Sequence, residues 1–219
     1  MILAIADVLS PTDLAEVVDG LASATFVDGR STAGWAARHV KANLQADAGP
    51  ELDHVSRLVE ARLDGHALFN LAVRPKLILG PMFSRYEPGH EYGTHVDDAL
   101  MGGARTDCSF TLFLSPPASY DGGELILSTS AGEDAYKLAA GSLVTYPATC
   151  LHRVAPVTRG TRLAAVGWVR SLIRDASRRE LLFDLETARR RLFDREGKSE
   201  DGDLLAKCAA NLLRMWCED

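Results

Sequence analysis

The sequence lacks any long hydrophobic run, and no segment reaches the roughly 18 consecutive apolar residues that a membrane-spanning helix needs. Its N-terminal stretch "MILAIADVLS" starts apolar, but it has no basic residues in front and meets an acid at Asp7, so it does not resemble a secretory leader. Cysteine is scarce, with four residues and no CxxC pair, which is typical of a reducing compartment rather than of a disulfide scaffold. We therefore expect a cytoplasmic protein.

Basic charge is the second shortage. The chain has 24 lysine and arginine residues against 30 aspartate and glutamate residues, and its formal net charge is −6. This balance excludes a protein that tracks a phosphate backbone, unless its charge is strongly segregated. The run from Arg189 to Arg191 lies among acidic residues and is typical of a solvated helix face. We expect neither nucleic acid nor a membrane among the partners.

The composition that is present fits one globular domain. A chain of 219 residues that is 47% hydrophobic can bury a sizeable core but is too short for two full-sized domains. Ser10-Pro11 predicts a helix start, and apolar residues follow at helical spacing. Pro50 opens a second helical pattern that ends at Asp64-Gly65. We expect residues 1–75 to form a helical part packed on the core.

The C-terminal part is also helical in pattern. Leucine and alanine recur at helical spacing after Asp175 and again from Leu204 to Trp216, and Asp201-Gly202-Asp203 separates the two segments. Residues 176–219 are therefore predicted to form a helical hairpin. Because neither helix is stable alone in water, we expect the hairpin to lay its apolar face on the β core.

Residues 76–175 have the texture of a β-domain. Short apolar runs rich in β-branched and aromatic residues alternate with turn signals such as Asp121-Gly122-Gly123. The runs are "KLILGPMFSRY", "SFTLFLS", "ELILST", "KLAAGSLVTYP" and "RLAAVGWVRSL". Five such runs with no helical pattern between them predict an antiparallel sandwich or barrel.

Two histidine patterns in "YEPGHEYGTHVDDAL" could bind a metal. "HEYGTH" resembles the HExxH zinc-protease motif, but its histidines are five apart and its glycines disfavour a helix. His95 and Asp97 fit better, because residues i and i+2 of an extended segment project from the same face. With His152, which follows another predicted strand, they make the two-histidine, one-carboxylate set that binds iron(II) and leaves coordination positions open. The other histidines, at positions 39, 54 and 66, show no ligand spacing.

Arg162 lies ten residues after His152, across the turn "APVTRGT". We expect it on the next strand, pointing into the same cavity. A planar guanidinium can hold a carboxylate with two hydrogen bonds. Arg162 is therefore the candidate that holds the distal carboxylate of 2-oxoglutarate, whose keto acid end would chelate the iron.

The segments "RYEPGHEYGTHVDDA", "TLFLSPPASYDGGELIL" and "AGSLVTYPATCLHRVAPVTRGTRLAAVGWVRSLIRD" resemble the bacterial PKHD-type hydroxylases, which are iron(II)- and 2-oxoglutarate-dependent dioxygenases related to prolyl 4-hydroxylases. The resemblance implies a mainly β fold with flanking helices and a double-stranded β-helix, or jelly-roll, core. It implies iron(II) at His95, Asp97 and His152, with 2-oxoglutarate held by Arg162. It also implies that Tyr86 lines the cosubstrate pocket and that L-ascorbate keeps the iron reduced.

The expected activity is hydroxylation of an unidentified peptide, protein or small-molecule substrate with 2-oxoglutarate and O2, releasing succinate and CO2. Two alternatives stay open: a sensor that binds iron and 2-oxoglutarate without oxidising a substrate, and a cupin-like metal enzyme without redox chemistry. Turnover excludes the first, and dependence on oxygen excludes the second. The terminal helices could shape the substrate entrance, form a homodimer contact or cover the core, and we expect the last.

Overall fold

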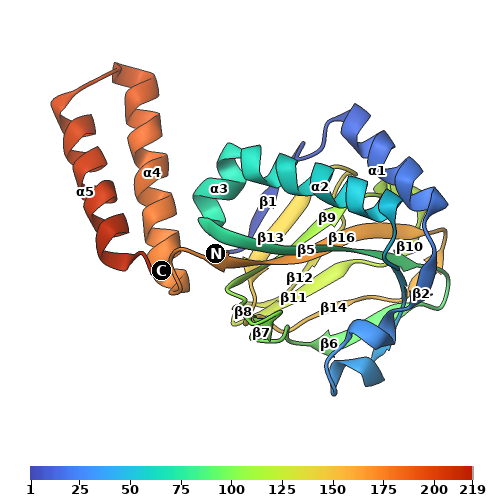
Figure 1. Ribbon diagram of the computed structural model, residues 1–219. Helices are drawn as coiled ribbons and strands as arrows, with labels where there is room; N and C mark the ends of the chain where they lie inside the picture. The colour runs from blue at the N-terminus through green and yellow to red at the C-terminus, as the bar shows by residue number, and fades with distance from the viewer. Residues whose placement is uncertain (219) are drawn as a thin grey trace.

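Two antiparallel β-sheets form the body of the molecule, as the computed structural model of residues 1–218 shows (Figure 1). The larger sheet has seven strands, in the order β1 (Leu3–Ile5), β13 (Leu143–Pro147), β9 (Cys108–Phe113), β16 (Arg162–Ser171), β5 (Pro75–Tyr86), β4 (Leu44–Ala46) and β2 (Phe26–Asp28). The smaller has five, in the order β12 (Gly132–Tyr136), β11 (Leu125–Thr129), β14 (His152–Val154), β6 (Glu91–His95) and β3 (Lys41–Ala42). The predicted mainly β jelly-roll core with flanking helices is confirmed.

Two short ribbons and three 3-10 turns complete the β part. Strand β7 (Leu100–Met101) pairs with β8 (Ala104–Arg105), and β10 (Asp121–Gly122) pairs with β15 (Val157–Arg159). The 3-10 turns are η1 (Gly29–Thr32), η2 (Ala37–His39) and η3 (Pro117–Ser119). Nowhere in residues 1–218 does a helix combine the length and apolar character needed to cross a membrane.

Strand β9 shows how the sheets are layered. All six of its residues are buried, because both faces of the strand are covered. Phe110 and Leu112 pack with the helices on one side, whereas Phe113 packs with residues of the smaller sheet on the other. Its two polar residues, Ser109 and Thr111, face a cavity between the sheets rather than water.

Helices α1 (Pro11–Ser23), α2 (Pro50–Gly65) and α3 (Ala67–Val73) cover the outer face of the larger sheet (Figure 1). Ser10 caps α1 and Pro11 is its first residue, and α2 begins at Pro50. Both predicted helix starts are therefore confirmed. The sequence did not foresee α3 or the strands β1 to β4, because two- or three-residue strands are too short to show a period. Residues 1–75 are therefore not purely helical and add strands to both sheets.

The C-terminal hairpin consists of α4 (Ala176–Glu196) and α5 (Glu200–Trp216). The predicted break at Asp201-Gly202-Asp203 is wrong, because the chain turns at Gly197 to Ser199. Ser199 caps α5 by accepting a hydrogen bond from the Gly202 amide at 3.2 Å. The acidic residues that read as a linker lie in the first helical turn, where the helix dipole favours negative charge.

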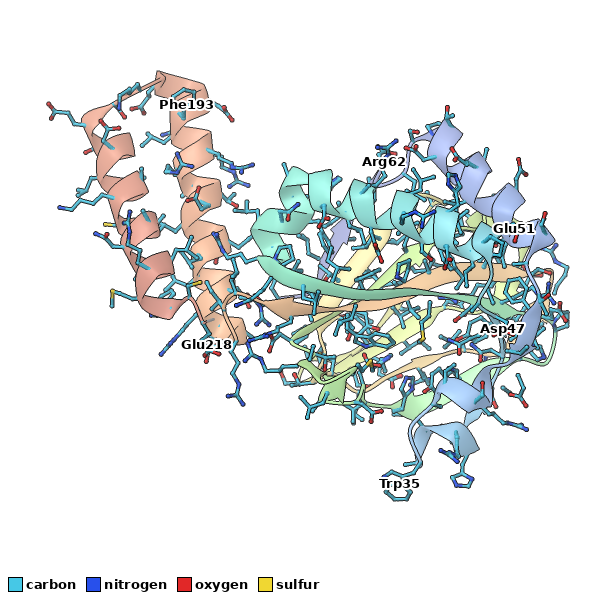
Figure 2. The ribbon with its side chains drawn as sticks, in the orientation of Figure 1. Trp35, Asp47, Glu51, Arg62, Phe193 and Glu218 are labelled. Carbon is cyan, nitrogen blue, oxygen red and sulfur yellow. The ribbon has the colours of Figure 1, made fainter. Side chains whose placement is uncertain are left out.

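The expected packing of the hairpin on the β core holds only at its base, where Phe183 of α4 packs against the main core. The hairpin extends away from the sheets, with Phe193 near its far end (Figure 2). Leu182 and Ala209 are buried between its own helices and against Ile173 at its base. Arg179 anchors that base, since its guanidinium donates to the carbonyl oxygens of Ile173 at 2.7 Å and Arg174 at 2.8 Å. Beyond that base, the helices stabilise each other rather than cover the core.

Candidate metal and cosubstrate site

His95, Asp97 and His152 meet at one end of the smaller sheet. Strands β6 and β14 pair with His95 opposite His152, and their ring centroids are 4.2 Å apart. One potential ligand atom from each of the three side chains lies within 4.8 Å of the others. Within the described part of the chain, no other group of histidine, cysteine or acidic residues shows this spacing. Two imidazoles and one carboxylate are the donor set that suits non-haem iron(II).

Backbone carbonyls set the orientation of both imidazoles. His95 Nδ1 lies 2.8 Å from the Gly93 oxygen, and His152 Nδ1 lies 3.1 Å from the Cys150 oxygen. Because a carbonyl oxygen only accepts, each Nδ1 must carry the proton and each Nε2 keeps its lone pair. Both rings are therefore held in the tautomer that binds a metal through Nε2.

Two further side chains hold the triad in place. Ser109 Oγ donates to Asp97 Oδ2 at 2.5 Å, so that Oδ1 remains on the side of His152, 3.8 Å from its Nε2. The Tyr92 ring stacks on His95 with centroids 3.6 Å apart. Burial, followed by the nearby His152, holds the pKa of His95 well below its ordinary value. The imidazole is thus neutral, as metal binding requires.

Arg162 lies in the same cavity, opposite Tyr86 in the register of β16 and β5. It is 1% exposed, and none of its three guanidinium nitrogens has a hydrogen bond of normal geometry among the residues described, although the group interacts with the Tyr120 hydroxyl. Its guanidinium carbon lies 5.0 Å from the centre of the Tyr86 ring. A buried cation without an acceptor is costly, and a ligand carboxylate would remove that cost. Burial raises the pKa of Tyr86, which keeps its hydroxyl protonated as a hydrogen-bond donor.

Gly123, in the predicted turn, lets the backbone approach Arg162 closely. Its φ of +66° favours glycine, and an added Cβ would lie 3.0 Å from Arg162 Cδ and 3.1 Å from the Tyr120 ring. The turn therefore closes over the side chain that the cosubstrate would need.

The cavity between the sheets has a volume of about 170 Å³ and includes residues that the sequence did not point to. Lys41, Asn43 and Gln45 face it at alternate positions from β3 into β4, and Thr32 faces it from η1. The sequence "KANLQ" does show polar residues at alternate positions, but in a strand this pattern ordinarily indicates a polar face turned toward solvent. Burial lowers the pKa of Lys41 to about 8, although the charges of Asp97 and Asp28 oppose the shift.

Histidines outside the triad have other roles. His54 pairs with Glu16 on the exposed side of α2, and His66 Nδ1 accepts the Phe69 amide at the start of α3. Asp98 is exposed beside Gly34 at the rim of the cavity. The predicted ligands are thus brought together, and the other histidines named in the sequence lie apart from them.

Comparison with known proteins adds two kinds of similarity. The family model of the 2OG-Fe(II) oxygenase superfamily matches residues 81–170. A PKHD-type hydroxylase of Acaryochloris marina is 54% identical over 220 residues, and one of Crocosphaera subtropica is 53% identical over 222 residues. In both cases the match covers 100% of each chain.

Solved structures share the fold at lower identity. A Pseudomonas putida prolyl-4-hydroxylase superimposes with a TM-score of 0.51 at 23% identity, over 78% of this chain and 92% of its own. A Trichoplax adhaerens prolyl hydroxylase, in complex with a peptide fragment of hypoxia inducible factor, has a TM-score of 0.55 at 17% identity. The match covers 82% of this chain and 86% of that one. The alpha ketoglutarate dependent epimerase SnoN gives 0.56 at 15% identity, over 78% of each chain. At these identities the likeness shows the fold alone.

Proposed function

Because the chain belongs to the PKHD-type hydroxylases of the 2OG-Fe(II) oxygenase superfamily, we propose that its cavity hydroxylates a substrate carbon at an iron held by His95, Asp97 and His152. The protein is an oxidoreductase, a 2-oxoglutarate-dependent dioxygenase, and its cofactors are iron(II) and 2-oxoglutarate. The assignment of these cofactors to particular residues is the proposal. L-ascorbate, as the reductant that maintains iron(II), belongs to it too.

The proposed reaction consumes one 2-oxoglutarate and one O2 for each C–H bond oxidised. One oxygen atom enters the substrate as a hydroxyl group, and the other enters the carboxylate of succinate. The carbon lost from 2-oxoglutarate leaves as CO2. Bound iron(II) would supply the oxygen chemistry, and the protein supplies geometry and the exclusion of water.

Each residue has a distinct part in that geometry. The two imidazoles present Nε2 and Asp97 presents Oδ1, while the carbonyls of Gly93 and Cys150 keep the imidazoles from turning. Arg162 would bind the distal carboxylate of 2-oxoglutarate, with the Tyr86 hydroxyl as a further donor. The observation that carries the proposal is the presence, in one cavity, of an iron-type donor set and a buried guanidinium that has no carboxylate partner within residues 1–218.

We also propose residues 76–175 as the catalytic unit, with 1–75 and 176–219 as attached parts. The superfamily match to residues 81–170 lies within that unit, which supports the division. The unit is not closed by itself, because Lys41 and Asn43 from the N-terminal part contribute to the cavity wall. A cytoplasmic location is likewise a proposal, supported by four cysteines that are all free thiols.

The direct test measures succinate formed from 2-oxoglutarate by the iron-loaded protein, with and without O2. Wild type should form succinate only with both iron(II) and O2. Asp97→Ala should lower succinate formation by more than about 100-fold. Removal of a hydrogen bond that only supports a metal ligand costs about 10–100-fold, and this change removes the ligand itself. His54→Ala, on the exposed side of α2, is the control and should match wild type. Full succinate production by Asp97→Ala with unchanged iron affinity would show that the ligand assignment is wrong.

A further inference from the structure

The cavity holds a second buried cation that the proposed chemistry does not use. Lys41 is 5% exposed and lies in the cavity wall. Its Nζ forms no ion pair with any carboxylate of the described chain, and the one hydrogen bond found for it is to Thr32 Oγ1 at 3.0 Å. A lysine is almost never this buried unless it is paired. The position of Lys41 therefore requires an explanation.

Its neighbours orient the ammonium group without neutralising it. The Thr32 hydroxyl accepts from Lys41 and is itself hydrogen-bonded to Gln45 Oε1, so the chain of contacts ends in neutral groups. The Tyr92 ring centre lies 5.1 Å from Lys41 Nζ, and the same ring stacks on His95. The ammonium is thus fixed close to the proposed iron ligands with donor capacity to spare.

A second unsatisfied group lies on the same stretch of chain. Asn43 is 4% exposed and lines the cavity. Neither the oxygen nor the nitrogen of its carboxamide has a hydrogen bond of normal geometry within residues 1–218, although the group interacts with the Tyr86 hydroxyl. Buried amides are ordinarily hydrogen-bonded. Two polar groups two residues apart therefore face the cavity with unused capacity.

The charges of the proposed complex leave Lys41 unbalanced. The distal carboxylate of 2-oxoglutarate matches Arg162, and its other carboxylate together with Asp97 matches the two charges of iron(II). These groups cancel one another, and Asp28, the other acid whose charge acts on Lys41, is exposed and pairs with Arg30. The ammonium of Lys41 adds a positive charge in a buried site, where an unpaired charge is most costly.

We propose that the substrate that is hydroxylated carries a carboxylate, which binds Lys41 Nζ with the Asn43 carboxamide as a second contact. The inference rests on the proposed function, because it assumes that Arg162 is occupied by 2-oxoglutarate. It places the substrate on the β3 side of the cavity, beside Tyr92. An acid rather than its amide or ester is the class of substrate to screen.

A crystallographic experiment with bromide tests the proposal without knowledge of the substrate. Crystals of the full chain with zinc(II) in place of iron are soaked in sodium bromide with and without saturating 2-oxoglutarate, and anomalous scattering locates the metal and the anions. Without 2-oxoglutarate, bromide should occupy both Arg162 and Lys41. With 2-oxoglutarate, it should remain only at Lys41, within hydrogen-bonding distance of Nζ, and Lys41→Met crystals should lose it.

The variants give a matching test in solution. Lys41→Met should leave the dissociation constant of 2-oxoglutarate within about twofold of wild type, as expected for independent sites, whereas Arg162→Gln should raise it about tenfold or more. Lys207→Met, an exposed lysine on α5, is the control for the lost charge. Lys41→Arg should retain the bound bromide, because the charge is kept.

The outcomes separate the two proposals. If 2-oxoglutarate binds Arg162 and no bromide is found at Lys41, the substrate inference is overturned and the proposed function stands. If the distal carboxylate of 2-oxoglutarate binds Lys41 instead, both the role of Arg162 and the substrate inference are wrong. If zinc(II) binds away from the triad, the proposed function fails at its first step, whatever the bromide shows.

Discussion

At the scale of single residues, the site depends on groups that hold the ligands rather than on the ligands alone. His95 and His152 are oriented by carbonyl oxygens, and Asp97 is oriented by the Ser109 hydroxyl. Carbonyl contacts cannot be removed by a side-chain change, whereas the serine can be replaced. Ser109 is therefore the residue at which the importance of ligand orientation can be measured.

Ser109→Ala should weaken metal binding by about 10–100-fold, because it removes the hydrogen bond that fixes the Asp97 carboxylate. Ser109 is buried in β9, but the change removes only one oxygen atom, so the fold should be kept. Calorimetric titration with zinc(II) measures the effect. Ser119→Ala, at an exposed serine in η3, is the control. Equal affinities in wild type and Ser109→Ala would show that Asp97 is held in place by other contacts.

The sequence predicted some site residues and missed others for a physical reason. His95 and Asp97 are linked by the two-residue period of an extended chain, so their common direction follows from local geometry alone. His152 follows one predicted strand, and Arg162 lies ten residues later on the next. Ser109 and Lys41 reach the site only through the pairing of distant strands, and that register is not visible in a single sequence.

At the scale of elements, the C-terminal hairpin departs most from expectation. Its apolar pattern correctly predicted two helices, but the pattern does not say which partner an apolar face will meet. Much apolar surface remains in contact with water, since four large side chains are more than half exposed: Leu181, Phe193, Leu204 and Met215. The hairpin's stability therefore rests on a small internal cluster.

Leu182→Ala should destabilise the hairpin by about 2–5 kcal/mol, because it leaves a cavity between α4 and α5. Leu181→Ala, at the adjacent exposed position, should change stability by no more than about 0.5 kcal/mol. Hydrogen exchange measured by peptide should show faster opening of residues 176–216 in Leu182→Ala and unchanged protection in β9 and β16. Equal loss of protection in the sheets would mean that the hairpin and the core unfold as one unit.

The contact between α1 and α2 stabilises the fold to an extent that depends on pH. Hydrogen bonds from Arg62 and Ser10 hold the pKa of Asp13 well below its usual range. A carboxylate whose pKa is lower in the folded state stabilises the fold above its ordinary pKa, and that stabilisation is lost as the pH falls toward the folded-state pKa. Figure 2 shows Arg62 on the outer side of the helical layer, where the pair can be changed without disturbing the cavity.

Asp13→Asn should therefore lower the free energy of unfolding by about 1–3 kcal/mol at pH 7. The difference from wild type should shrink below about pH 4, where carboxyl groups become protonated in the unfolded chain. Urea unfolding at several pH values measures this. Asp19→Asn, an exposed acid on the same helix, provides the control and should show little change at any pH. A difference that stays constant with pH would assign the effect to packing rather than to charge.

At the scale of the whole molecule, two sheets enclose a cavity to which both the central and the N-terminal parts of the chain contribute. The sequence predicted the long strands and the first helices, because their periods extend over enough residues to be read. It could not place β3 beside β6, and so it could not show that Lys41 lines the site. The fold alone also leaves the reaction open, since one structural neighbour is an epimerase. Relatives that match the full chain at above 50% identity make it a dioxygenase.

In the proposed site the triad binds iron(II), and Arg162 binds the cosubstrate that chelates it. An anaerobic titration of the metal-free protein with iron(II) and 2-oxoglutarate tests both, because a keto acid chelated to iron(II) gives a visible charge-transfer absorption. We predict that the band appears with one equivalent of iron(II) in wild type, is absent in Asp97→Ala, and needs about tenfold or more 2-oxoglutarate in Arg162→Gln. Iron binding without a band at any 2-oxoglutarate concentration would show that the cavity does not bind 2-oxoglutarate at the iron.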